Sequence, residues 1–341
     1  MTKLSCRLAC AALLLGAVSL PLQAQSYHLA KTVPLVGDGG WDYLTFDSTA
    51  HRLFIAHSTQ VLVVDAESGS LLGQVPGLNG AHGVALAVTE GHGFASSGHD
   101  SSVTMFDLKT YKVLKKFTAA DDADAILYDP ASKHVFSFNG DANSSSVIDP
   151  VSGTVIGNID LGGKPEFGVS AWDGTLFVNL EDKGEIVQID AKAMKVTRRW
   201  PIAPCEEPTG LAIDRKHHRL FSGCGNQVMA ISDATNGRLI TTLPIGKGVD
   251  GCAFDPGTNL AFSSNGEGSL TVIKEDSPDS FHVASTVPTK RGARTITVDP
   301  KTHRVFTASA EYGATPAATP ENPRPRPAIV PGTFVLLVLE Q

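Results

Sequence analysis

Apolar and polar positions along the chain form short alternating segments that are separated by turn residues. Residues 123–161 are typical: "ADAILYD", "HVFSFNG", "SVID" and "TVIGNIDL" are strand-like, and "PASK", "DANSS" and "PVSG" lie between them. Asp-Pro, Ser-Gly and Asn-Gly pairs at such breaks favour tight turns. No stretch of useful length repeats its apolar residues with the period of a helix. The pattern predicts an all-β chain of four-stranded units.

The four-stranded unit recurs along the chain. An aspartate that ends a strand recurs every 41–43 residues, at Asp65, Asp107, Asp149, Asp190 and Asp233. Seven phenylalanines recur every 40–44 residues, at Phe54, Phe94, Phe136, Phe177, Phe221, Phe262 and Phe306. Seven units of about 42 residues predict a seven-bladed β-propeller of four-stranded antiparallel blades. A residue type that recurs in every unit is expected to serve the packing that all units have in common, so we interpret the phenylalanines as core between blades.

Five histidines lie two or three residues before these phenylalanines, and the same reasoning applies to them. We interpret them as turn residues on one rim of the propeller: His51, His92, His134, His218 and His303.

The last unit departs from the repeat. A Pro-rich insertion, at about residues 310–332, follows the second strand, and "TFVLLVLE" then supplies a third strand, so the chain ends one strand short. At the other end, "YHLAKTVPLVG" (residues 27–37) precedes the first innermost strand. The N-terminal strand is therefore predicted to close the last blade, which removes exposed strand edges. The C-terminal apolar run is too short to span a membrane as a helix, and we expect no membrane span.

The first 24 residues have the character of a secretory signal. A Lys and an Arg precede an apolar run from Leu8 to Leu20, and a small residue, Ala24, stands at the expected cleavage site. We predict a signal peptide at 1–24, a single propeller domain at 25–341 and a periplasmic or secreted location. We also expect a monomer.

The net charge of the chain disfavours nucleic acid as a partner. The predicted mature chain has 28 − 2 = 26 basic and 35 acidic residues, a net charge of −9. Such a chain repels phosphate backbones, and only 7% of its residues are aromatic. Single-stranded nucleic acid binding requires basic residues interleaved with exposed aromatic ones, so we treat it as a disfavoured third hypothesis.

Three cysteines remain after the predicted signal peptide. Cys205 lies in the loop before the fifth innermost strand, and Cys224 ends the adjacent strand, so antiparallel pairing brings both to one face. An oxidising compartment permits a disulfide between them, and we predict it. Cys252 lies inside an apolar strand and is interpreted as an inert core thiol.

Residues 146–165, "SVIDPVSGTVIGNIDLGGKP", resemble the repeat of the YVTN β-propeller family, the YncE-like exported propellers. "LFVN" at 176–179 stands where the motif that names the family stands, and the likeness covers residues 27–341. The chain departs from the family in its final-blade insertion and in keeping the proline before the innermost strand only at Pro165 and Pro208. Since members share no single reaction, the resemblance implies the fold rather than a chemistry.

A site is expected where the units differ. The residues just before the innermost strands should meet at one mouth of the central channel: Asp42, His82, Asp124, Glu166, Thr209, Asp250 and Arg294. Clustered carboxylates raise one another's pKa or hold a cation, and several such ligands suit Ca²⁺ or Mg²⁺. Three interpretations remain open: a hydrated acidic funnel with Arg294 as internal counter-charge, a ligand or ion site, and a catalytic site.

The loops between second and third strands open on the same face. They carry His57, His99 and Asn139, together with the insertion and its Glu311 and Tyr312. The "PRPRP" motif favours an extended backbone, and long loops without periodicity are often functional. The insertion is interpreted as a lid over the mouth, as a passive spacer, or as a segment that offers Arg324 and Arg326 to a partner.

Two functions follow from these residues. The first is a non-enzymatic exported binding module for a small ligand, an ion or a protein at the channel mouth, with no required cofactor. The alternative is a lactonase-like, metal-dependent hydrolase. In it Asp42, Glu166 and Asp250 hold a divalent cation and His82 acts as general base, an analogy across folds.

Overall fold

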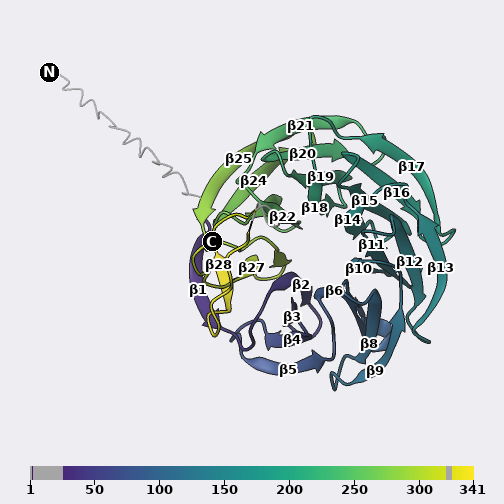
Figure 1. Cartoon of the computed structure of the whole chain (residues 1–341). Helices are drawn as coiled ribbons and strands as arrows, with labels where there is room; N and C mark the ends of the chain where they lie inside the picture. Colours follow the sequence, from purple (N-terminus) through teal and green to yellow (C-terminus); the bar gives the residue numbers. More distant parts are fainter. Residues whose placement is uncertain (1, 3–25, 320–324) are drawn as a thin grey trace.

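The computed structural model describes residues 2, 26–319 and 325–341; the predicted signal peptide and Arg324 lie outside the described residues, apart from residue 2. The chain forms seven four-stranded antiparallel sheets arranged as a ring (Figure 1). The predicted seven-bladed all-β propeller is confirmed. In the described ranges the single helical element is a 3₁₀ turn, η1 (Val88–Glu90).

Each blade runs from the channel to the rim in chain order. The first blade contains β2 (Trp41–Asp47), β3 (Arg52–His57), β4 (Gln60–Asp65) and β5 (Leu71–Pro76). The second contains β6 (Ala81–Ala87), β7 (His92–Ser97), β8 (Ser102–Asp107) and β9 (Val113–Thr118). The third contains β10 (Ala123–Asp129), β11 (His134–Asn139), β12 (Ser144–Asp149) and β13 (Thr154–Asp160), close to the segments expected from the sequence.

The next three blades repeat this order. The fourth contains β14 (Pro165–Ser170), β15 (Thr175–Leu180), β16 (Glu185–Asp190) and β17 (Lys195–Pro201). The fifth contains β18 (Pro208–Asp214), β19 (Arg219–Cys224), β20 (Val228–Asp233) and β21 (Leu239–Pro244). The sixth contains β22 (Val249–Asp255), β23 (Leu260–Asn265), β24 (Ser269–Ser277) and β25 (Ser280–Pro288).

The seventh blade joins the two ends of the chain. It contains β26 (Thr297–Asp299), β27 (Arg304–Ser309), β28 (Val335–Glu340) and, outermost, β1 (His28–Pro34). Figure 1 shows β1, in purple, beside β28, in yellow. Their antiparallel register runs from His28 opposite Glu340 to Pro34 opposite Val335. The predicted closure is confirmed, and the C-terminal apolar run is an interior strand of this blade. No helix in the described ranges has the length and apolar character that a membrane crossing requires.

The core lies between blades. All seven recurring phenylalanines are buried on the second strands of the blades. Phe306 of the seventh blade, for example, packs with Leu44 and Leu53 of the first. The interpretation of these residues as inter-blade core is confirmed, and the free energy gained by burying them holds the ring of blades together.

The recurring polar residues fix turns. Asp65 accepts hydrogen bonds from the Ser68 backbone N–H and hydroxyl, each at 2.7 Å, and these bonds lower the pKa of Asp65. Three of the rim histidines reach a neighbouring blade: His51 Nε2 lies 3.2 Å from Asp299 Oδ2, His92 Nδ1 lies 2.8 Å from the Pro150 carbonyl oxygen, and His303 Nδ1 lies 2.7 Å from Asp255 Oδ2. These contacts agree with a structural role for all three residues.

Candidate functional site: the charged channel mouth

Six of the seven predicted mouth residues are the second residue of an innermost strand, so their placement just before the strand was wrong by two positions. In all six blades the strand register shifts at this point. Trp41 pairs with His57 and Leu44 with Ile55, which leaves Asp42 and Tyr43 in a β-bulge. A bulge turns side chains away from the normal pleat, and here it presents them at the end of the channel. Arg294 lies three residues before β26.

We call the set of Asp42, His82, Asp124, Glu166, Thr209, Asp250 and Arg294 the mouth ring. Its first group is centred on His82. His82 Nδ1 lies 2.7 Å from Asp42 Oδ2 and 3.2 Å from Asp124 Oδ1. Burial alone would lower the pKa of His82, but hydrogen bonds and charges from the two carboxylates outweigh it and raise the pKa to about 11. Burial raises the pKa of both carboxyls.

The second group is centred on Arg294. Its Nε donates a hydrogen bond to Asp250, and its Nη2 donates to Asp42 Oδ1 at 3.3 Å. Burial raises the pKa of Asp250, and the guanidinium group opposes that shift only in part. Arg294 is therefore an internal counter-charge that spans the first, sixth and seventh blades.

The third group contains a cation that the sequence reasoning missed. Lys164 Nζ lies 3.1 Å from Glu166 and 2.7 Å from Glu181. Burial raises the pKa of Glu166 to about 9, and the charges of Asp124 and Glu181 add to that shift. Lys164 lies in the "Gly-Lys-Pro" sequence (residues 163–165) that ends the stretch 146–165.

Carboxyl groups outnumber cations at this mouth. Six carboxyl groups, of Asp42, Asp122, Asp124, Glu166, Glu181 and Asp250, are electrostatically coupled to three cationic side chains, of His82, Lys164 and Arg294. Each of the four carboxyl groups in the mouth ring has a raised pKa, because burial and neighbouring acids disfavour its ionised form.

Two aromatic residues cross the channel beneath the mouth ring. Tyr43 of β2 contacts Phe167 of β14, with ring centroids 5.0 Å apart, although these strands lie on opposite sides of the ring (Figure 1). Burial and the charges of the ring carboxylates raise the pKa of Tyr43 well above its usual value. We call this pair the plug.

The plug could have been found in the sequence. The residue after each mouth-ring position is small in five blades and aromatic in two: Tyr43, Gly83, Ala125, Phe167, Gly210, Gly251 and Thr295. A Cβ atom at Gly210 would lie 2.6 Å from the backbone nitrogen of Cys252, so neighbouring innermost strands require a small residue there. Tyr43 and Phe167 are the two exceptions to this preference for small residues, and their rings meet in the channel.

The remaining predicted site residues have other contacts. His57 is buried, stacks on Phe334 at 4.3 Å, and has a pKa that burial lowers. His99 is exposed and covers Gly80. Thr209, in the ring but uncharged, donates a hydrogen bond to the Val249 carbonyl at 3.0 Å. Buried Asn139 donates to Ser144 and Ser146, which is a structural role.

The insertion begins beside the mouth. Tyr312 pairs with Ile329 in a β-bridge, and its ring lies 6.3 Å from that of Trp41. The guanidinium of Arg291 lies 5.1 Å from the Tyr312 ring centroid. Glu311 accepts a backbone hydrogen bond from Val330, and Arg326 is exposed. The two ends of the insertion are therefore fixed against the fold.

The proposed metal ligands are divided between groups. Among the described residues, Asp42, Glu166 and Asp250 are not one of the sets whose ligand atoms lie within 4.8 Å of one another. Arg294 pairs with Asp42 and Asp250, whereas Glu166 pairs with Lys164. The set that does meet this distance at the mouth is Asp42, His82 and Asp124. The hydrolase alternative stays a hypothesis: its proposed ligands do not form one such set among the described residues, and the two carboxylates beside His82 raise the pKa of the proposed general base.

A second set with such spacing lies outside the channel. His217 Nδ1 is 2.7 Å from Asp214 Oδ2 and 2.8 Å from Glu275 Oε1. The two carboxylates belong to the fifth and sixth blades, and both are buried. We interpret this set as an ionic link between blades.

The three cysteines after the predicted signal peptide are not equivalent. Cys205 and Cys224 are joined by a disulfide with Cα atoms 5.4 Å apart, while Cys252 is free and buried, and burial raises its pKa to about 12.

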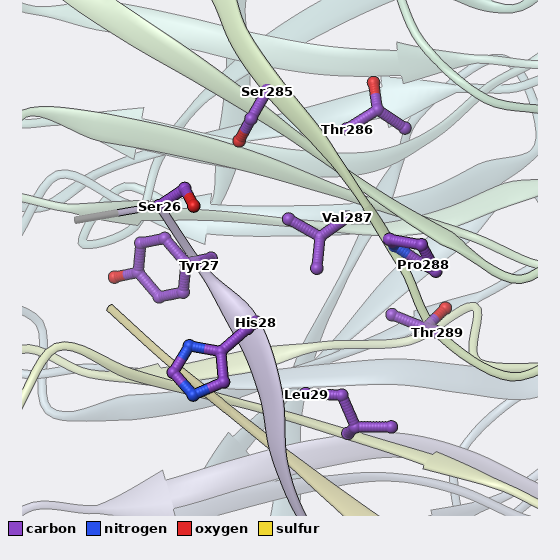
Figure 2. Close-up of a pocket in the computed structure, with 9 residues that line it drawn as sticks. All are labelled: Ser26, Tyr27, His28, Leu29, Ser285, Thr286, Val287, Pro288 and Thr289. Atoms are coloured by element: carbon purple, nitrogen blue, oxygen red, sulfur yellow. The ribbon is translucent and has the colours of Figure 1, made fainter. Parts of the chain in front are cut away.

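A pocket of about 460 Å³ lies between residues 26–29 and 285–289 (Figure 2). Its lining contains no Asp, Glu, Lys or Arg, so we interpret it as a gap between the outer strands β1 and β25.

The comparisons with known proteins support the fold. A chain in the crystal structure of a mitotic checkpoint complex is 13% identical, with a TM-score of 0.74 and 99% of each chain covered. The structure of U3-55K is 10% identical, with a TM-score of 0.74, 92% of this chain and 99% of that chain covered. Hydrazine synthase from Kuenenia stuttgartiensis is 16% identical, with a TM-score of 0.71, 80% and 93% covered. The sequence matches no protein-family model and no curated protein.

Proposed function

We propose that the protein is a non-enzymatic binding module that takes a small cationic ligand, a metal ion or an organic ammonium group, at its channel mouth. The observation that carries the proposal is the excess of carboxyl groups over cations in the mouth ring. A bound cation would stabilise the ionised carboxylates and lower their pKa values. β-Propellers are common interaction scaffolds, and that general role fits the fold.

The cellular setting is also part of the proposal. The segment from Leu8 to Ala24 supports export to the periplasm or the medium, and the 146–165 repeat supports membership of the YVTN propellers. A disulfide-bonded monomer suits an oxidising compartment. Cell fractionation with N-terminal sequencing tests export: the mature chain should begin at or near residue 25, and a cytoplasmic chain with residues 1–24 intact would refute it.

Binding is tested by isothermal titration with Ca²⁺, Mg²⁺ and 1,4-diaminobutane, after elemental analysis of protein purified without chelator. Asp250→Asn removes a carboxylate from the mouth ring while keeping its shape, and should weaken binding of the preferred cation about tenfold or more. Asp276→Asn is the control, because Asp276 is exposed and pairs with His282 outside the channel. Equal affinity in both variants, or no binding of any of the three cations, would leave only a hydrated acidic funnel.

A further inference from the structure

The channel on the far side of the plug is an apolar cavity. Its volume is about 520 Å³, within the range of small-molecule sites. All seven blades contribute to its lining, which is mainly aliphatic and aromatic, with residues such as Val84, Ile126, Val169 and Phe254. Among the described residues that line it, the charged side chains are Asp47 and Arg215.

The two charged residues differ in their partners. Asp47 is buried and already bonded: Arg52 Nε donates to its Oδ2 at 2.9 Å, and the Thr49 backbone N–H donates to its Oδ1 at 3.0 Å. These bonds lower the pKa of Asp47. Asp47 therefore offers no free charge to a guest.

Arg215 is cationic, and the one carboxylate whose charge acts on it is that of its chain neighbour Asp214, which itself pairs with His217. Its Nε donates to the Ser170 carbonyl at 3.0 Å, and its guanidinium carbon lies 3.8 Å from the ring centroid of Trp172. In the described part of the chain no carboxylate forms an ion pair with it. Burial lowers the pKa of Arg215 to about 10. The stacked guanidinium is held in place with its terminal N–H groups available.

Trp172 marks the entrance. It is 62% exposed, in contrast to Trp41 at 4% and Trp200 at 7%. It lies in the turn between β14 and β15 with a positive φ of 70°, a conformation that costs free energy for a bulky residue. An exposed aromatic side chain beside a cation and an apolar cavity is a suitable contact for an amphipathic ligand.

We propose that this cavity binds a small amphipathic carboxylate, whose apolar chain or ring occupies the channel and whose carboxylate pairs with Arg215 beside Trp172. The planar fork of an arginine matches a carboxylate in a bidentate pair. The lining supplies the apolar surface that the rest of the ligand needs. The site is separate from the mouth ring, which lies beyond the plug.

The probes are hexanoate, octanoate, 1-octanol and octylamine, titrated into the mature protein by calorimetry and by tryptophan fluorescence. Octanoate should bind at least tenfold more tightly than octanol or octylamine, and about fourfold more tightly for each methylene added from hexanoate. Binding should change the Trp172 emission, and Trp172→Phe should abolish that change while the calorimetric signal remains.

Arg215→Gln should weaken octanoate binding at least tenfold and leave octanol binding unchanged. Arg198→Gln is a matched control, because Arg198 also lies over a tryptophan, Trp200, at 5.4 Å, but on the outermost strand β17. Equal octanoate affinity in the two variants, no dependence on chain length, or no binding at millimolar octanoate would each overturn the proposal. Unchanged thermal midpoints establish that both variants fold.

Discussion

The two ends of one channel present opposite chemistry. At the mouth ring, carboxyl groups and cations are buried together and pair with one another, as Asp42 does with His82 and Arg294. On the far side of the plug, one cation, Arg215, lies at the edge of an apolar cavity, and within the described residues it forms no ion pair. The same innermost strands line both ends, so the difference depends on which strand positions face each end.

The comparison shows how a repeated scaffold separates stability from binding. The recurring phenylalanines occur in all seven blades and the recurring turn aspartates in five, and both serve the fold. The positions that vary between blades give each end of the channel its own chemistry, and the two proposed binding sites rest on them. The plug of Tyr43 and Phe167 keeps the two environments apart.

Removing the plug should have the largest effect. Tyr43→Ala deletes a buried aromatic ring, and such deletions cost about 3–5 kcal/mol of unfolding free energy. Tyr43→Phe keeps the ring contact with Phe167 and should cost under about 1.5 kcal/mol. Urea unfolding measures both. If the alanine variant were as stable as the phenylalanine variant, the aromatic contact would not separate the two ends as described.

Removing the counter-charge of the mouth ring should have the next largest effect. Arg294→Met leaves Asp42 and Asp250 buried without that cation, and we expect a loss of about 1–3 kcal/mol at pH 8. The loss should shrink at pH 5, because burial raises the pKa of both carboxyls and lets them be protonated. Thermal unfolding at the two pH values measures this dependence.

Arg238→Met is the matched control for that experiment. Arg238 pairs with Asp279 on the surface, where both side chains are more than half exposed. Exposed pairs contribute about 0–1 kcal/mol. A loss at Arg294 no larger than at Arg238, or one independent of pH, would contradict the electrostatic account of the mouth ring.

The free energy of unfolding should also change with pH, in a direction that the raised pKa of Glu166 fixes. The pKa of Glu166 is raised to about 9 in the folded protein. Its neutral form therefore stabilises the fold fully below about pH 4.5, and this contribution is lost as the pH rises towards 9. His82, with a pKa raised to about 11, also loses its contribution as the pH rises, from about pH 6.5 upwards.

Glu166→Gln tests that direction. Between pH 5 and 9 the wild type should lose more stability than this variant, by at most about 5 kcal/mol for one group with this shift. Glu185→Gln, at an acid that pairs weakly with Arg199 at 3.8 Å on the outer strands, should keep the wild-type slope. Denaturant unfolding at several pH values measures the slopes, and a slope that the Glu166 variant leaves unchanged would refute the shift.

The sequence predicted the architecture well because the signal was repeated seven times. Blade number, the closing strand and the buried phenylalanines all follow from positions that every unit shares. The mouth ring was predicted as a set, but its pairing was not. Spacing along the chain does not reveal that Asp42 lies in a β-bulge, or that Lys164, directly before β14, pairs with both Glu166 and Glu181.

The burial of His57 and the plug have the same physical origin. His57 ends a strand on the face of the mouth, yet the seventh-blade residue Phe334 covers it. The plug crosses between the first and fourth blades. Both are contacts between residues of different blades, and the repeat pattern gives the position of each residue but not the contact itself.

The most direct test of the central claim is proton release when a cation binds to the mouth ring. The preferred cation is titrated into the wild-type protein at pH 7.5 in two buffers with different ionisation enthalpies, and the difference in heat gives the protons exchanged. Because the mouth carboxyls have raised pKa values, binding should release roughly one proton per cation, and Asp250→Asn should reduce that number. Cation binding with no proton release would contradict the claim.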